Sequence, residues 1–144
     1  MITRDQIVSE ARTWVGTPFH HQARVKGAGV DCVGLAIGVA NTLGLVVKDM
    51  RAYSRVPLNG MFLKAVTEQT ESIAFEDVLP GDMLLFKFNH VEAQHLAIIT
   101  QINPIHIVHA YSHVAKCVEH ELDQTWRARL VCACRFKELS CQLN

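Results

Sequence analysis

The chain has 144 residues, a length typical of one domain, and 49% of them are apolar, which suits a folded core. Lys and Arg number 14, as do Asp and Glu, so no basic surface is forced and nucleic acid is not an expected partner. The longest apolar stretch is too short and too broken for membrane insertion. The charged start lacks the pattern of a signal peptide, which predicts that the protein is cytoplasmic when made, with reduced cysteines.

A helix is predicted near the start of the chain. Thr3 and Gln6 have the spacing of a capping box, and apolar residues then recur at helical spacing to about Trp14. A Gly-Thr-Pro turn ends this helix. Residues 19–31 show no periodic pattern and are therefore predicted to form a loop.

A second, buried helix is predicted over residues 32–43. It opens with Cys32 directly after Asp31, and Gly44 has the position of its C-cap. We expect Asp31 to be the N-cap and to accept hydrogen bonds from N–H groups near Gly34. The missing side chain of Gly34 would then leave room beside the sulfur.

The rest of the chain has the pattern of β-strands. A short helix is predicted over residues 62–70, and a Leu-Pro-Gly-Asp turn at 79–82 precedes the strands. The expected strands cover residues 83–88, 95–102, 105–111, 114–118 and 130–136. This order predicts an α+β fold with N-terminal helices packed on a C-terminal antiparallel sheet of about five strands. With no internal repeat or linker, we expect a single domain over residues 1–144.

Cys32 is the candidate nucleophile. A helix N-terminus presents unpaired N–H groups and a partial positive charge, which favour a thiolate and predict a lowered thiol pKa. The backbone N–H of Cys32 is a candidate oxyanion donor. A lone cysteine at a helix start is most often a small buried hydrophobic residue, so a catalytic interpretation needs partner residues.

Two histidines on neighbouring predicted strands are the candidate partners. Alternation puts His109 on the same strand face as Ile107 and Tyr111. A short turn at 103–104 makes this strand the neighbour of the one that begins at His95, so the two imidazoles can meet on the face shared with the core. We expect His95 to be the general base and acid, with His109 hydrogen-bonded to its other ring nitrogen.

Metal binding is the main alternative chemistry for these residues. His106 and His109 face opposite sides of a strand, and Cys132 and Cys134 share a face without a third ligand. No spacing matches a zinc ribbon or a His-Glu-x-x-His helix, so no metal or cofactor is expected. The other conspicuous side chains are expected to be solvated or at the rim of the site (His20, His21, His113, His120), in the core (Trp14, Trp126), or structural or exposed thiols (Cys117, Cys141).

Five motifs lie in order along nearly the whole chain: WVGTPF at 14–19, GVDCVGL at 29–35, LPGDMLLF at 79–86, HLAII at 95–99 and IVHA at 107–110. Together they resemble the NlpC-type cysteine peptidases, a branch of the papain-like fold, and most of all the members encoded with bacteriophage tail genes. The resemblance implies an NlpC-type fold with Cys32 as nucleophile, His95 as base and His109 as the orienting residue.

The resemblance also implies an activity and a setting. The activity is hydrolysis of the bond between D-γ-glutamyl and a diamino acid in peptidoglycan stem peptides, through a thioester on Cys32 and without a cofactor. The setting is a phage or prophage tail, with tail proteins as partners and delivery to the cell wall.

The chain departs from the family at several positions. Phe19 stands where the family usually has a tyrosine whose hydroxyl lines the pocket of the cysteine, and His20 or His21 is the expected substitute for that donor. Val33 replaces the usual serine, and the segment before His109 is slightly longer than is common. Phe19, His21 and Asp31 are therefore the residues predicted to support the substrate or the oxyanion.

Two other functions stay open. Phe19 and the lack of a wall-binding module are compatible with a structural tail-tip assembly protein that has weak or no hydrolase activity. An amidase or acyltransferase on the same fold would keep Cys32, His95 and His109 but act on a different bond. The stretch 51–55, with two arginines and a tyrosine, could line the cleft or be ordinary surface.

Overall fold

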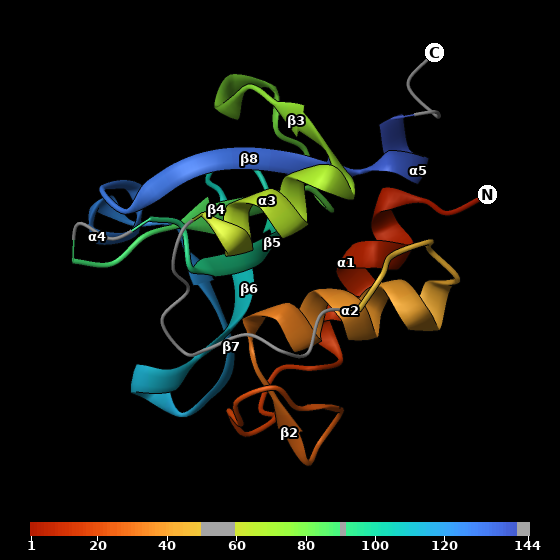
Figure 1. Cartoon of the computed structure of the whole chain (residues 1–144), viewed down its shortest axis with the longest axis vertical. Helices are drawn as coiled ribbons and strands as arrows, with labels where there is room; N and C mark the ends of the chain where they lie inside the picture. Colours follow the sequence, from red (N-terminus) through yellow and green to blue (C-terminus); the bar gives the residue numbers. More distant parts are fainter. Residues whose placement is uncertain (50–59, 90–91, 141–144) are drawn as a thin grey trace.

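The computed structural model of the chain describes residues 1–49, 60–89 and 92–140. The 51–55 stretch and Cys141 lie outside these residues. The architecture is α+β, as predicted, with helices packed against one antiparallel sheet (Figure 1). Among the described residues, no helix combines the length and the apolar character that a membrane crossing requires.

The sheet has six strands rather than about five, in the order β3-β8-β4-β5-β6-β7. The strand that the sequence did not predict is β3 (Thr70–Ile73), which pairs with β8 at one edge. It is short and mostly polar, and it closely follows α3 (Met61–Glu68); the predicted helix 62–70 included Thr70, and no element was predicted for the other three residues. The other strands are β4 (Met83–Phe86), β5 (His95–Gln101), β6 (His106–Tyr111), β7 (Lys116–Glu121) and β8 (Leu130–Phe136).

Two helices cover one face of the sheet. α1 (Arg4–Arg12) begins with the predicted capping box: Gln6 N donates to Thr3 Oγ1 at 3.1 Å, and Thr3 N donates to Gln6 Oε1 at 2.8 Å. α2 (Cys32–Leu43) packs beside α1 and against β5 and β6 (Figure 1). Gly44, at φ 73°, closes α2 in the left-handed conformation that its sequence position predicts.

Smaller elements complete the fold. The predicted loop contains a two-stranded hairpin of β1 (Arg24–Val25) and β2 (Gly29–Val30), which lies next to α2. The remaining elements are η1 (Phe75–Asp77), η2 (Ser112–Val114), α4 (Gln124–Arg127) and α5 (Lys137–Ser140). In Figure 1, α4 lies on the left of the sheet, away from α1 and α2 on the right.

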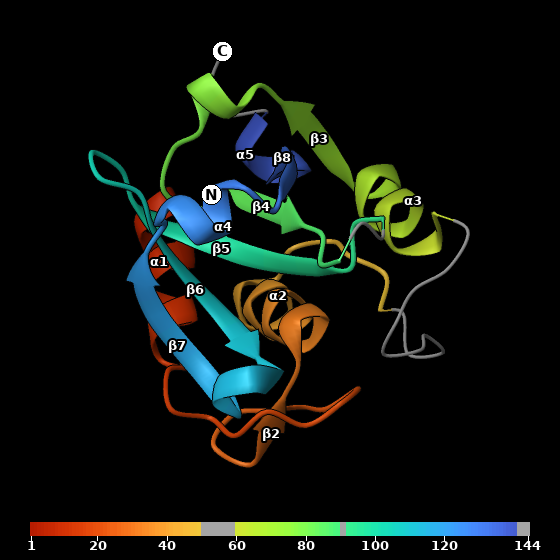
Figure 2. The same ribbon diagram turned by 90° about the vertical axis from the view of Figure 1, so that its left-hand side faces the viewer.

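Both faces of the sheet are buried, and each has its own apolar cluster. On the α1–α2 face, Leu96, Ile98 and Val108 pack with residues of α2. On the opposite face, Phe86 and Ile107 pack with Trp126 of α4. The twist of the sheet turns β6 and β7 away from the direction of β5 (Figure 2), and Trp126 of α4 contacts residues of all three strands.

A buried ionic cluster ties α1 to the sheet. The carboxylate of Asp82, in the predicted turn before β4, is fully buried. It accepts hydrogen bonds from Arg4 Nη1 at 2.9 Å and from Nε and Nη2 of Arg135, each at 2.9 Å. The backbone N–H of Leu79 donates to the same carboxylate at 2.9 Å, so this buried charge is well compensated.

Candidate active site

Cys32 opens α2 and lines a pocket of about 230 Å³. The residue as a whole is half-buried. The backbone N–H groups of Leu96 and Val33 form hydrogen bonds to the sulfur. Because Leu96 directly follows His95, the sulfur lies against the start of β5, and His95 lines the same pocket. The structure therefore brings the predicted nucleophile and base together at one cavity.

The thiol pKa differs from the prediction. Burial, followed by the neighbouring Asp31 carboxylate, raises the pKa of Cys32 to about 12. The N–H groups of Leu96 and Val33 and the charge of Arg24 lower it by less. The prediction of a lowered pKa rested on the partial positive charge of the helix N-terminus, and the loss of water around the sulfur outweighs that charge. The sulfur therefore rests as a neutral thiol at neutral pH.

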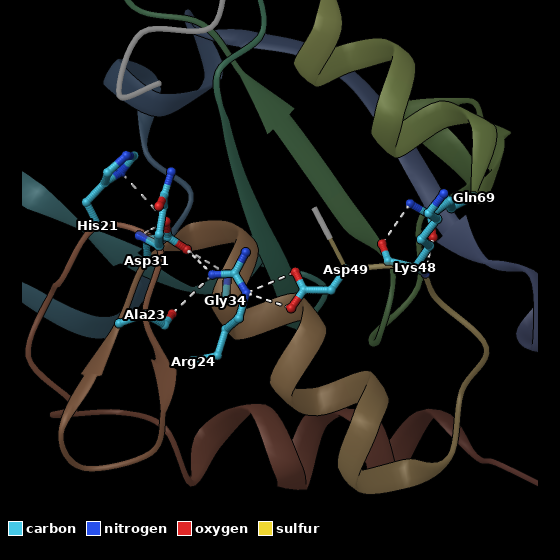
Figure 3. A network of polar contacts seen from close by, with 9 residues as sticks. His21, Ala23, Arg24, Asp31, Gly34, Lys48, Asp49 and Gln69 are labelled. Atoms are coloured by element: carbon cyan, nitrogen blue, oxygen red, sulfur yellow. Dashed lines mark hydrogen bonds and ion pairs between the residues drawn. The ribbon is translucent and has the colours of Figure 1, made fainter. Parts of the chain in front are cut away.

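Asp31 is the N-cap of α2, as predicted. Gly34 N donates to its Oδ1 at 2.7 Å, and Gln22 N donates to its Oδ2 at 2.7 Å. Arg24 lies between two carboxylates: its Nη1 is 3.2 Å from Asp31 Oδ1, and its Nε is 3.0 Å from Asp49 Oδ1 (Figure 3). The carboxylate of Asp31 thus fixes the hairpin to the start of α2, although it also borders the pocket.

The space beside Gly34 is filled, which corrects the expectation that this glycine leaves room near the sulfur. A Cβ at Gly34 would lie 2.1 Å from the backbone oxygen of Ala23 and 3.1 Å from Arg24 Nη1. The glycine therefore allows the hairpin backbone to approach α2 closely (Figure 3).

The segment that follows α2 is held by a second set of contacts. The side chain of Gln69 accepts a hydrogen bond from Lys48 N and donates one to Lys48 O (Figure 3).

His95 and His109 meet as predicted. His95 Nε2 and His109 Nδ1 are 2.7 Å apart, and the two rings are nearly perpendicular, at 71°. β5 and β6 pair with Ile98 opposite Val108, which places His109 diagonally across from His95. The bond occupies Nε2 of His95, so Nδ1 is the ring nitrogen left for the thiol or a substrate. His109 itself is fully buried behind His95 and does not line the pocket.

His120 is a third member of this group, which the sequence prediction placed among the solvated or rim histidines. Its Nε2 lies 2.7 Å from His109 Nε2, and its Nδ1 lies 2.8 Å from the backbone oxygen of Glu121. His120 is half-buried, as a rim residue would be, but its bond to His109 was missed because the predicted strand 114–118 stops too early. β7 continues to Glu121 and places His120 opposite Ile107, on the same face as His109.

Trp126 covers the three imidazoles from α4. Its ring centroid is 4.7 Å from that of His109, 5.6 Å from that of His95 and 6.0 Å from that of His120. Burial lowers the pKa of His95 to about 3, and the positive charge of Arg129 adds to this effect. Burial lowers the pKa of His109 to about 2, with the neighbouring His95 and His120 adding to it. Both rings are therefore neutral at neutral pH.

The remaining predicted support residues border the pocket. Phe19 and His21 both line it, whereas His20 is exposed and does not. His21 Nδ1 is 3.9 Å from Asp31 Oδ2, so of the two histidines it is the one that lies at the pocket. The pocket also includes Tyr111, whose ring is stacked on His109 at 5.6 Å. Its position on the His109 face was readable from the alternation of β6, although no role was assigned to it.

The described residues contain no group of three or more His, Cys, Asp or Glu side chains arranged to hold a metal ion. The hydrogen bonds that join His95, His109 and His120 engage ring nitrogens with one another rather than directing them to a common point. Cys132 and Cys134 are both unbridged, and Cys117 is buried, as a structural thiol would be. The chemistry available at the pocket is thus that of a thiol next to a neutral imidazole.

No protein-family model matches the sequence, and no curated protein matches it. Solved structures do match. An NLP/P60-family protein of Staphylococcus aureus, described as similar to a lipoprotein, has a TM-score of 0.68 at 23% identity, covering 92% of this chain and 41% of that one. An NlpC/P60 family protein from Bacillus cereus has a TM-score of 0.73 at 14% identity, covering 94% of this chain and 40% of that one.

A third match is the NlpC/p60 domain of the peptidoglycan hydrolase SagA, with a TM-score of 0.67 at 19% identity, covering 94% of this chain and 100% of that domain. The chain thus spans about two fifths of the staphylococcal and Bacillus proteins and the whole length of the SagA domain. Likeness at these identities concerns the arrangement of the backbone. The chain has the fold of the NlpC/P60 proteins, the fold that its motifs predict.

Proposed function

We propose that this chain is a cysteine peptidase that hydrolyses peptidoglycan stem peptides. The observation that carries the proposal is the convergence on one pocket of Cys32, at a helix N-terminus, and His95, whose far nitrogen is bonded to His109. The fold shared with the SagA domain, a domain of a peptidoglycan hydrolase, supports the substrate class. The fold alone would not carry a function, because one fold hosts many activities.

The resting state of the pocket decides how the thiol is activated. With the pKa of Cys32 at about 12 and that of His95 at about 3, the pair rests as thiol and neutral imidazole rather than as an ion pair. The proton of Cys32 therefore moves to Nδ1 of His95 as the sulfur attacks the substrate carbonyl carbon. His109 holds the other nitrogen of His95 and keeps the ring aimed at the pocket.

The reaction then follows the two halves of acyl transfer. A bond forms between Sγ and the carbonyl carbon, and the carbonyl electron pair moves onto oxygen, where the backbone N–H of Cys32 at the helix start can donate to it. Collapse of this intermediate breaks the C–N bond, and the leaving amine takes the proton from His95. The thioester on Cys32 is then hydrolysed by water, which gives up a proton to His95, and the thiol is restored.

The finer parts of the proposal follow the sequence motifs. The bond cleaved is the one between D-γ-glutamyl and a diamino acid, and the protein acts at the cell wall after synthesis in the cytoplasm. We propose a phage or prophage tail as the means of delivery, with tail proteins as partners. Detection of the chain in purified tail particles by mass spectrometry would support this route, and its presence only in the soluble fraction of lysed cells would count against it.

The activity is tested with purified stem peptides that carry either diaminopimelate or lysine as the diamino acid. Mass spectrometry of the products should show fragments cut at the D-γ-glutamyl bond with the wild type and none with Cys32→Ala. Cys132→Ala is the matched control, because Cys132 is a half-buried thiol in β8 outside the pocket and its loss should leave the products unchanged. A folded wild type that cuts neither peptide would favour the structural tail-tip role, and a different product would identify an amidase or acyltransferase.

A further inference from the structure

Three imidazoles form a continuous chain across β5, β6 and β7 that ends on a backbone carbonyl. Nε2 of His95 contacts Nδ1 of His109 at 2.7 Å, and Nε2 of His109 contacts Nε2 of His120 at 2.7 Å. Nδ1 of His120 contacts the backbone oxygen of Glu121 at 2.8 Å. His120 is not one of the three residues that carry the proposed reaction, yet it is joined to them by short hydrogen bonds.

When all three rings are neutral, the carbonyl fixes where each proton of this hydrogen-bonded series lies. A carbonyl oxygen only accepts, so Nδ1 of His120 must carry the hydrogen. A neutral imidazole has a single N–H, and Nε2 of His120 is then an acceptor. Nε2 of His109 must therefore donate to it, which leaves Nδ1 of His109 as an acceptor for Nε2–H of His95. The last ring in the chain, His95, is left with an unprotonated Nδ1.

The assumption of neutral rings is supported by their surroundings. His109 is fully buried, His95 is 5% exposed, and Trp126 packs against both, so water reaches these two rings poorly. Burial lowers the pKa of both rings far below neutrality. His120 lies between Glu119 and Glu121 in β7. The carboxylate of Glu119 accepts hydrogen bonds from Arg12 and Thr100 rather than from the imidazoles.

We propose that His120 is a positioning residue that sets the tautomer of His95 through His109, so that His95 presents a bare Nδ1 to the pocket. With a bare Nδ1, His95 can accept the proton of the Cys32 thiol. This effect on catalysis rests on the proposed peptidase function. The tautomer itself is a property of the protein without substrate. If the hydrogen bonds between the three rings ran in the opposite direction, Nδ1 of His95 would carry the hydrogen and His95 could not act as the base.

Two substitutions separate this role from simple packing. His120→Gln keeps an oxygen that can accept from Nε2–H of His109, whereas His120→Leu fills a similar volume with no acceptor. Nitrogen-15 NMR of the histidine rings in the substrate-free protein reports which nitrogen carries the hydrogen. We expect the wild type and His120→Gln to show His95 protonated on Nε2, and His120→Leu to show His95 divided between the two tautomers.

Kinetics with stem peptides supply the second measurement. His120→Leu should lower kcat by at least about tenfold with KM unchanged, because only base catalysis is impaired, and His120→Gln should recover most of that loss. Wild-type His95 protonated on Nδ1 would overturn the inference, as would a leucine variant with an unchanged tautomer or unchanged kcat. If the leucine variant does not fold, the spectra of the wild type and of His120→Gln still test the inference, because both must show His95 protonated on Nε2. A wild type with the expected tautomer but no hydrolysis would instead refute the proposed function.

Discussion

His95 and His109 share a 2.7 Å contact between Nε2 of the first ring and Nδ1 of the second, on the buried face of the sheet that carries Trp126. This contact assigns different tasks to the two nitrogens of His95. One holds the ring in place through β6, and the other remains for the pocket that Cys32 lines. The site therefore holds neutral groups that are in position before a substrate arrives.

The reactivity of Cys32 should show its raised pKa. Because burial and the Asp31 carboxylate raise the pKa to about 12, the thiolate is scarce at neutral pH. Alkylation of Cys32 by iodoacetamide, followed residue by residue with mass spectrometry, should keep accelerating with pH beyond the ~8.5 of an ordinary cysteine. Asp31→Asn removes the charge but keeps a capping oxygen, and it should shift the profile to lower pH. A wild-type profile that levels off below that value would show a preformed thiolate–imidazolium pair instead.

Acid should destabilise the fold through the buried imidazoles. The folded-state pKa values of His95 and His109 are lowered to about 3 and about 2, whereas an unfolded chain has histidines near ~6.5. Below that value the unfolded state binds more protons than the folded state, so the free energy of unfolding falls as the pH drops from about 6.5 toward about 3. Urea unfolding between pH 7 and pH 4 measures this slope.

His109→Gln is the matched variant for this measurement, because it removes one of the two depressed groups. Its free energy of unfolding should fall less steeply over the same pH range than that of the wild type. Acidic side chains contribute to both slopes equally, so the difference isolates the imidazole. Identical slopes would mean that His109 is readily protonated in the folded protein.

Asp82 should be among the most sensitive positions for stability. Its replacement by alanine would leave the Arg135 guanidinium, now bonded twice to the carboxylate, buried without its partner. Breaking a buried pair in this way costs ~3–5 kcal/mol. The exposed Glu71→Gln in β3 is a suitable control, with an expected change within ~0.5 kcal/mol. Equal stability of the two variants in urea would show that the ionic cluster does not hold α1 to the sheet.

Gly34→Ala should disturb the hairpin that borders the nucleophile. The added Cβ would lie 2.1 Å from the Ala23 oxygen, so the backbone of β1 or the first turn of α2 must move. We expect a loss of ~3 kcal/mol in the free energy of unfolding, the cost of overpacking against rigid backbone. Asn41→Ala, on the exposed side of α2, should change stability little. A Gly34→Ala variant as stable as this control would contradict the close approach.

Local signals explain why much of the fold was predictable. The capping box at Thr3, the N-cap at Asp31 and the C-cap at Gly44 each depend on residues a few positions apart, and all three are confirmed. The meeting of His95 and His109 was predictable because alternation and a short turn together decide which side chains of adjacent strands share a face. These features need no knowledge of distant packing.

The features that were missed depend on distant packing. β3 is stabilised by pairing with β8, whose paired residues lie 60 to 66 positions further along the chain, and its own sequence carries little strand signal. His120 joins the other histidines only because β7 extends along β6 to Glu121. The raised pKa of Cys32 comes from the water excluded by the surrounding fold, which a helix start viewed alone does not reveal.

The most direct test of the account is the intact mass of the protein during turnover. Wild-type protein mixed with a diaminopimelate stem peptide and quenched in acid within milliseconds to seconds should carry the mass of the acyl fragment as a thioester, mapped to Cys32. Cys32→Ala should carry no such mass and release no product. Product formation by Cys32→Ala at the wild-type rate, or an acyl group attached to a residue other than Cys32, would contradict the proposed peptidase.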